Sequence, residues 1–141
     1  MTITILEAVE RFDTQVDDHH DQQSTIPVTA GLARQGDVAI IPATMVRNLG
    51  TAMTPVPKTG IPVVRGESGG NTHLLLADGP VFFDWDSRDS QEQLALGTLT
   101  IPEGSTGFLA HPEHAFLGIA PGSYQIRRQR EQADIIRLVA D

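Results

Sequence analysis

Glycine and proline interrupt this chain so often that most of it can build only short secondary-structure elements. Thirteen glycines and nine prolines are spread through the 141 residues. Short apolar runs lie between them, and several alternate with polar residues as a half-buried strand does. From Ile26 onward we therefore expect about seven or eight short strands. They would form one mainly β domain, either a β-sandwich or a small barrel.

The predicted strands differ in how clearly their ends are marked. Asp78 and Gly79 separate two apolar runs, at 73–77 and 81–85, and this dipeptide predicts a tight hairpin. Pro80 places the second of these strands at a sheet edge. Residues 46–62 are expected to form an irregular loop. The other predicted strands are 38–42, 94–101, 106–110 and 123–130, and 135–139 is either a closing strand or a short helix.

The N-terminal residues have a different periodicity. Thr4 followed by Glu7 matches a capping box, which predicts a helix that begins here and ends near residue 17. A polar linker follows the helix, so we divide the chain into a helix with its linker (1–25) and a β-rich domain (26–141). The helix docks either on the body of its own chain or on a neighbour. Its apolar residues recur every three or four positions, at Ile5, Val9, Phe12 and Val16.

Charge and composition exclude several classes of protein. Ten basic and eighteen acidic side chains give a net charge of −8, which repels phosphate backbones and anionic membranes. Cysteine is absent, which excludes disulfides and thiolate metal sites. Glu7 and Glu10 interrupt the N-terminal apolar residues, so we expect no signal peptide, and no apolar run approaches the ~20 residues that span a bilayer. We therefore expect a soluble cytoplasmic protein that binds neither nucleic acid in general nor membranes.

Three histidines in the β-patterned body suggest a metal site. His73 follows a glycine-rich turn, and His111 and His114 flank Pro112 at a predicted strand end. Imidazole nitrogens bind transition metals, and a carboxylate such as Glu131 could complete the shell around one divalent ion. The alternative is that each histidine caps a carbonyl group or pairs with a neighbouring acid. The HExxH signature of metalloproteases is absent.

Two further sets of residues are candidates for binding. Arg127, Arg128 and Arg130 could meet a phosphate or carboxylate, although charge runs of this kind are more often solvated. Trp85, at the end of a predicted edge strand, could anchor a protein partner. Phe12 could do the same on the apolar face of the helix.

Several motifs resemble a group of small, uncharacterised bacterial and phage proteins in their order and spacing. The resemblance covers residues 33–141 and implies an intact domain, but the group has no established activity. Asn71 stands where the first histidine of the group's Gly-His-x-His stretch falls, which weakens a metal site built on paired histidines. The motifs are Gln35-Gly36-Asp37-Val38, Gly66-Glu67 with His73, His111-Pro112-Glu113-His114, Pro121-Gly122-Ser123-Tyr124, Gln129-Arg130-Glu131 and Val139-Ala140-Asp141.

Three functions are compatible with these observations. We favour a non-enzymatic binding or assembly module, which associates with itself or with another protein, because no complete catalytic motif occurs. The second is a metal-binding protein or metal-dependent enzyme that uses His73, His111 and His114. The third is an anion-binding protein that uses the arginine cluster. Whether the chain catalyses a reaction stays open.

Overall fold

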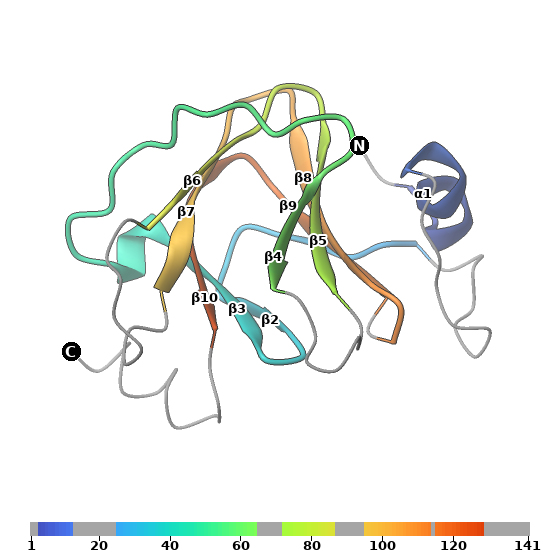
Figure 1. The fold of residues 1–141 in the computed structure, drawn as a ribbon, viewed down its shortest axis with the longest axis horizontal. Coiled ribbons are helices and arrows are strands. Elements are labelled where there is room, and N and C mark those ends of the chain that lie inside the picture. The colour runs from blue at the N-terminus through green and yellow to red at the C-terminus, as the bar shows by residue number, and fades with distance from the viewer. Residues whose placement is uncertain (1–2, 13–24, 65–71, 87–94, 114, 129–141) are drawn as a thin grey trace.

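The chain folds into two β-sheets that face each other, with an N-terminal helix outside them (Figure 1). The computed structural model describes residues 3–12, 25–64, 72–86, 95–113 and 115–128. The elements are α1 (Ile5–Phe12), β1 (Val28–Thr29), β2 (Ala33–Gln35), β3 (Val38–Pro42), the 3-10 turn η1 (Ala43–Met45), β4 (Ile61–Val64), β5 (His73–Asp78), β6 (Phe82–Trp85), β7 (Ala95–Ile101), β8 (Thr106–His111), β9 (Ala115–Ile119) and β10 (Gly122–Arg128).

Each sheet has five strands in the described part of the chain. The first sheet has the order β1-β9-β8-β5-β4, and the second has the order β2-β3-β10-β7-β6. Neighbouring strands are antiparallel except for β1 and β9, which are parallel. The expected mainly β fold is confirmed, and of the two expected architectures it is the sandwich.

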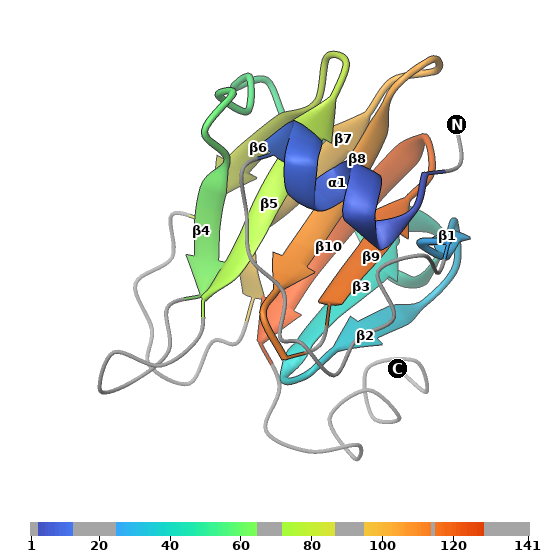
Figure 2. The ribbon, with the colours of Figure 1, turned by 90° about the vertical axis from the view of Figure 1, so that its right-hand side faces the viewer.

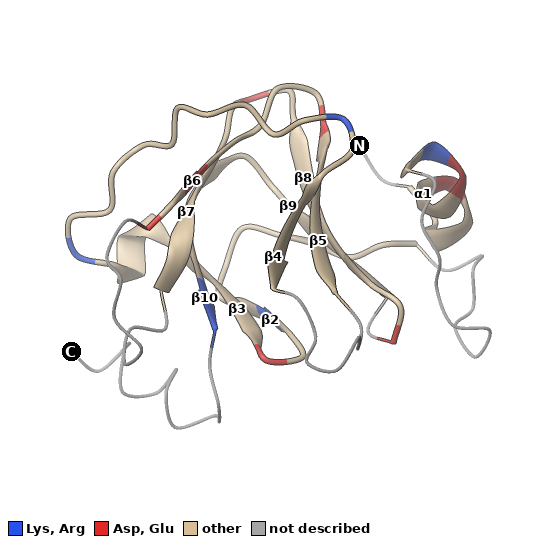
Figure 3. Ribbon diagram, in the orientation of Figure 1, with Lys and Arg blue, Asp and Glu red and all other residues tan. Residues whose placement is uncertain are grey.

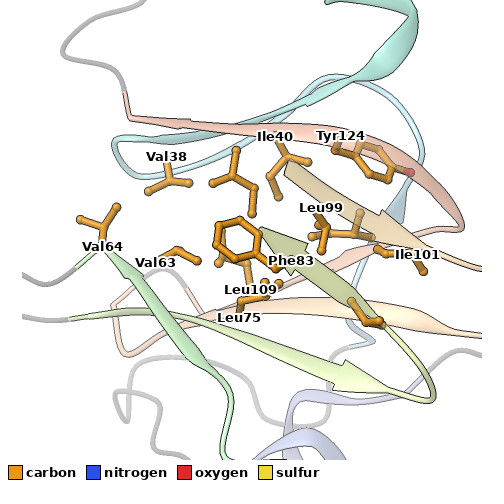
Figure 4. Packing of buried hydrophobic residues seen from close by; sticks show 13 residues of the cluster. Val38, Ile40, Val63, Val64, Leu75, Phe83, Leu99, Ile101, Leu109 and Tyr124 are labelled. Atoms are coloured by element: carbon orange, nitrogen blue, oxygen red, sulfur yellow. The ribbon is translucent and has the colours of Figure 1, made fainter. Parts of the chain in front are cut away.

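The hydrophobic core lies between the two sheets (Figure 4). Strand alternation builds it, because every second side chain of a strand points to the same face. On β10, Tyr124 and Ile126 are buried in this core as the sequence predicts. The Tyr124 hydroxyl donates a hydrogen bond to the Ala120 carbonyl oxygen at 2.7 Å, so its polar group is satisfied, and burial raises the pKa of the phenol. Leu75 and Leu109 face these residues from the first sheet, and Phe83 and Leu99 come from the second.

Helix α1 covers the outer face of the first sheet (Figure 2). The capping box forms as predicted: the Glu7 amide donates to Thr4 Oγ1 at 3.1 Å, and the Thr4 amide donates to Glu7 Oε1 at 3.2 Å. The Phe12 ring packs against Phe108 with centroids 5.6 Å apart. Arg11 at the end of the helix forms an ion pair with Asp78 of β5 at 2.9 Å. The helix therefore docks on its own chain.

The predicted hairpin at Asp78-Gly79 is wrong. β5 pairs with β4 and β8 in the first sheet, whereas β6 pairs with β7 in the second, so the turn carries the chain from one sheet to the other. The turn itself forms, since Gly79 has a φ of 90°. The physical reason is the shared core. Leu75 of β5 and Phe83 of β6 enter this core from opposite sheets, whereas two strands paired in one hairpin would enter it from the same side.

Most predicted strands agree with the structure within a residue or two. Residues 38–42 form β3 as predicted, and β6 lies at a sheet edge as Pro80 suggests. Strands β1, β2, β4 and β9 were not expected, and β4 begins inside the segment 46–62 that was predicted to be an irregular loop. The predicted C-terminal element at 135–139 and the expected end of the helix lie outside the described residues.

Gly97 provides a test of the close approach between β6 and β7. A Cβ atom at this position would meet the Asp84 carbonyl oxygen and the Phe83 ring. We predict that Gly97→Ala lowers the free energy of unfolding by about 1–3 kcal/mol through overpacking. Gly50→Ala is the control, since its Cβ would meet nothing within 4 Å. Urea unfolding gives the free energy of unfolding of both variants, and equal values for the two would contradict a close approach between β6 and β7.

Candidate functional site

His73 and His111 lie side by side at one end of the first sheet. β5 begins at His73 and β8 ends at His111, and the two strands are antiparallel with Leu74 opposite Ala110. This register brings the imidazole rings to a centroid distance of 4.4 Å with a tilt of 42°. Both residues are buried. The structure therefore brings together two of the predicted metal ligands, while His114 and Glu131 lie outside the described residues.

Both ring nitrogens of His73 face acceptors from the second sheet. The amide nitrogen of Gln35 donates to the Leu109 carbonyl oxygen at 2.8 Å, which fixes the orientation of that side chain. Its oxygen then lies 2.9 Å from His73 Nδ1, so Nδ1 is the donor. His73 Nε2 lies 3.2 Å from Asp37 Oδ1. An imidazolium at this position donates to both acceptors.

The polar contacts continue from the buried histidines to the surface. Asp37 lies in the turn between β2 and β3, and its carboxylate also faces Arg128 Nε at 3.5 Å. Figure 3 shows this acidic turn beside the basic end of β10. Asp37 and Arg128 are both about half exposed, so their ion pair alone contributes little stability. The continuous set of bonds, however, ties the ends of the two sheets together.

The His111 ring has a local backbone partner. Its Nδ1 accepts a hydrogen bond from the Glu113 amide at 3.1 Å, across the turn that contains Pro112. His73 is bonded at both nitrogens, and His111 is bonded at Nδ1. Among the residues that the structure describes, no three His, Asp or Glu side chains are grouped to hold a metal ion. His73 pairs with an acid, Asp37, as the alternative expectation has it, whereas His111 accepts a backbone N–H. A metal site that includes His114 and Glu131 stays a prediction.

The arginine cluster does not act as one unit in the described part of the chain. Arg127 and Arg128 point to opposite faces of β10, because successive residues of a strand alternate. Arg128 pairs with Asp37, whereas Arg127 Nε is buried on the outer face without a hydrogen-bond partner. Arg130 lies outside the described residues. An anion site at the three arginines stays a prediction.

Trp85 is the exposed aromatic residue of the described chain. Phe83 and Trp85 share a face of β6, and their rings meet edge to face with centroids 5.1 Å apart. Phe83 is 1% exposed in the core, but Trp85 is 53% exposed at the strand end. The other proposed partner-binding residue, Phe12, packs against Phe108 of its own chain. Trp85 therefore offers the larger surface to a partner.

A segment that sequence reasoning assigned to an irregular loop runs along β6. We call residues 52–56 the strap. The Phe83 amide donates to the Thr54 carbonyl oxygen at 2.8 Å, and the Val56 amide donates to that of Val81 at 2.9 Å. The Asp84 carboxylate accepts from the amides of Met53 and Thr54 at 2.9 and 3.1 Å. No sequence pattern marks this pairing.

The hydrogen bonds of the strap stabilise the charged form of Asp84. The bond with the Thr54 side chain, followed by that with the Met53 backbone, holds the pKa of this carboxyl below its usual value of 3.8. Desolvation acts in the opposite direction and does not prevail. The strap therefore favours the ionised form of the Asp84 carboxyl.

The comparisons with known proteins give a family but no activity. The model of a family described as a domain of unknown function (DUF8820) matches residues 34–129, and the chain belongs to that family. The match covers the second sheet except for Ala33 and the first sheet except for β1. No curated protein and no solved structure matches the chain. In the described residues, no helix has the length and apolar character needed to cross a membrane.

Gln35 gives a direct test of the buried polar network. Gln35→Leu keeps the side-chain volume but leaves the Leu109 carbonyl oxygen and His73 Nδ1 buried without these partners. We predict a loss of about 2–4 kcal/mol in the free energy of unfolding. Gln125→Leu is the matched control, because its Oε1 has no hydrogen-bond partner to lose. Denaturant unfolding compares the two, and similar losses would contradict a stabilising network.

Acid should weaken the contribution of Asp84. Its folded-state pKa lies below the unfolded value of 3.8, so its stabilisation is complete above pH 3.8 and is lost as the pH falls through the folded-state pKa. We predict that wild type is more stable than Asp84→Asn near neutral pH and that this difference shrinks in acid. Chemical unfolding of both proteins across the acid range measures it. A difference that stays constant below pH 3.8 would show that the carboxylate charge is irrelevant.

Proposed function

We propose that this chain is a non-enzymatic assembly module that binds a second copy of itself through the surface around Trp85. The exposure of Trp85 supports this proposal most directly. Two aromatic residues on one face of one strand differ sharply, with Phe83 at 1% and Trp85 at 53% exposure. A large apolar side chain gains free energy when a partner removes it from water.

The neighbourhood of Trp85 suits a protein contact. Tryptophan is enriched among the residues that dominate binding energy, because its large rigid ring fills pockets. Met53 adds a flexible apolar side chain that is 75% exposed, and its amide is bonded to the residue before Trp85. The contact therefore combines a rigid aromatic group with an adaptable one.

The His73–His111 network supports a role without catalysis. A general base needs a ring nitrogen that can take a proton from a substrate. Both nitrogens of His73 face protein acceptors, and Nδ1 of His111 accepts a backbone N–H. At His73 these bonds engage both ring nitrogens and connect the ends of the two sheets. The rigid end of the sandwich would then serve as the support for a binding surface.

The negative net charge of the chain opposes self-association. A two-fold contact places the same patch of both copies together, and each copy carries a net charge of −8. The apolar contact must overcome this repulsion, which salt screens. Self-association through Trp85 should therefore strengthen as ionic strength rises, opposite to a contact held by ion pairs.

Trp85 is the only tryptophan of the chain, so its fluorescence reports on this surface without labelling. We predict that the emission of the wild-type protein shifts to shorter wavelength as protein concentration and salt rise, while sedimentation shows a growing mass. Trp85→Ser should weaken association roughly thirty-fold or more, as expected for a residue that dominates an interface.

Leu32→Ser is the matched control for this substitution. Leu32 is 38% exposed and precedes β2, which lies at the opposite edge of the same sheet from β6. This variant should associate as the wild type does. A wild-type protein that stays monomeric with a fully hydrated indole at every concentration and salt level would contradict the proposal.

A further inference from the structure

The strap occupies the place of an additional strand beside β6. β6 is the last strand of the second sheet, and its outer edge would otherwise present unpaired backbone groups. Thr54 and Val56 bond to Phe83 and Val81, and Pro55 forms an isolated antiparallel bridge with Phe82. The strap thus satisfies the same groups that an incoming strand would use.

The strap pairs over a short distance. Pro55 and Pro57 have no amide hydrogen, so Val56 supplies the one backbone donor between them. Two backbone hydrogen bonds join the strap to the strand in this region. A ladder this short is weak by itself, and it needs other contacts to stay in place.

Contacts outside the ladder hold the strap. The Ala52 amide donates to Thr100 Oγ1 at 2.9 Å, and Val56 packs against the core between the sheets. Asp84 is in the middle of the pairing strand and accepts two strap amides at once. Charge-assisted bonds of this kind are about twice as strong as neutral ones. A near-isosteric substitution can remove the carboxylate without opening the core.

We propose that the strap is a built-in guard of the β6 edge, which keeps a second copy of the chain from pairing with that edge, and that Asp84 is its latch. The inference rests on the proposed function, because the guarded strand carries Trp85. When the strap leaves, the backbone groups of Phe83 and Val81 become available next to the exposed indole. A second β6 edge related by a two-fold axis offers the complementary donors and acceptors.

Asp84→Asn tests the latch. Asparagine keeps one acceptor but turns an amide N–H₂ group toward the second strap amide, so one bond is lost and two donors face each other. We expect hydrogen exchange at the Phe83 and Val56 amides to become roughly ten-fold faster or more, since both amides bond across the strap. Sedimentation at concentrations where wild type is monomeric should show the variant moving toward the mass of a dimer.

Asp78→Asn is the matched control, because it also removes one carboxylate charge. Asp78 lies on β5 in the other sheet and forms an ion pair with Arg11 of the helix. It should change neither the exchange of the two amides nor the mass. Unchanged exchange in Asp84→Asn would overturn the latch, and faster exchange with a protein that stays monomeric would overturn the guard. If Asp84→Asn associates while wild type does not associate at any concentration, the guard stands and assembly through Trp85 in the native chain fails.

Discussion

The burial of the first sheet on both of its faces is the constraint on which the rest of the structure depends. All six residues of β8 are buried, because the second sheet covers one face and helix α1 covers the other. Phe108 packs toward the helix and Leu109 packs toward the second sheet. A strand of this kind cannot alternate apolar and polar residues, since both directions are apolar. The helix is thus a third layer of the fold and covers a face that would otherwise meet water.

This double burial explains why the histidines form bonds with the protein. His111 ends the buried strand β8, and His73 begins its neighbour β5, so both rings leave water when the layers close. A buried polar group without partners costs free energy, and Gln35 and Asp37 from the second sheet provide them. The network therefore connects the layers at the point where the apolar core ends.

Patterns of neighbouring residues predicted the local structure correctly, but they did not predict which distant segments are in contact. Thr4 and Glu7 are three residues apart, and their capping box formed as expected. The Asp78-Gly79 turn also formed, but the partners of its two strands depend on which side of the core each strand covers. For the site, the sequence drew attention to His73 and His111, whereas their bonds to Gln35 and Asp37 depend on how the two sheets stack. Those bonds span 38 residues in the case of His73 and Gln35.

The edges of the sandwich differ in how they are protected against pairing with another strand. An open sheet invites pairing at its outer strands, and short strands or added prolines reduce that risk. β4 carries Pro62, and β1 is only two residues long, so neither edge of the first sheet pairs readily with a strand of another chain. β6 has no such protection within the strand itself, and the strap with Pro55 supplies it from outside. The edge that needs a separate guard is also the one that carries the exposed Trp85, which is why pairing and apolar contact are best considered together at this strand.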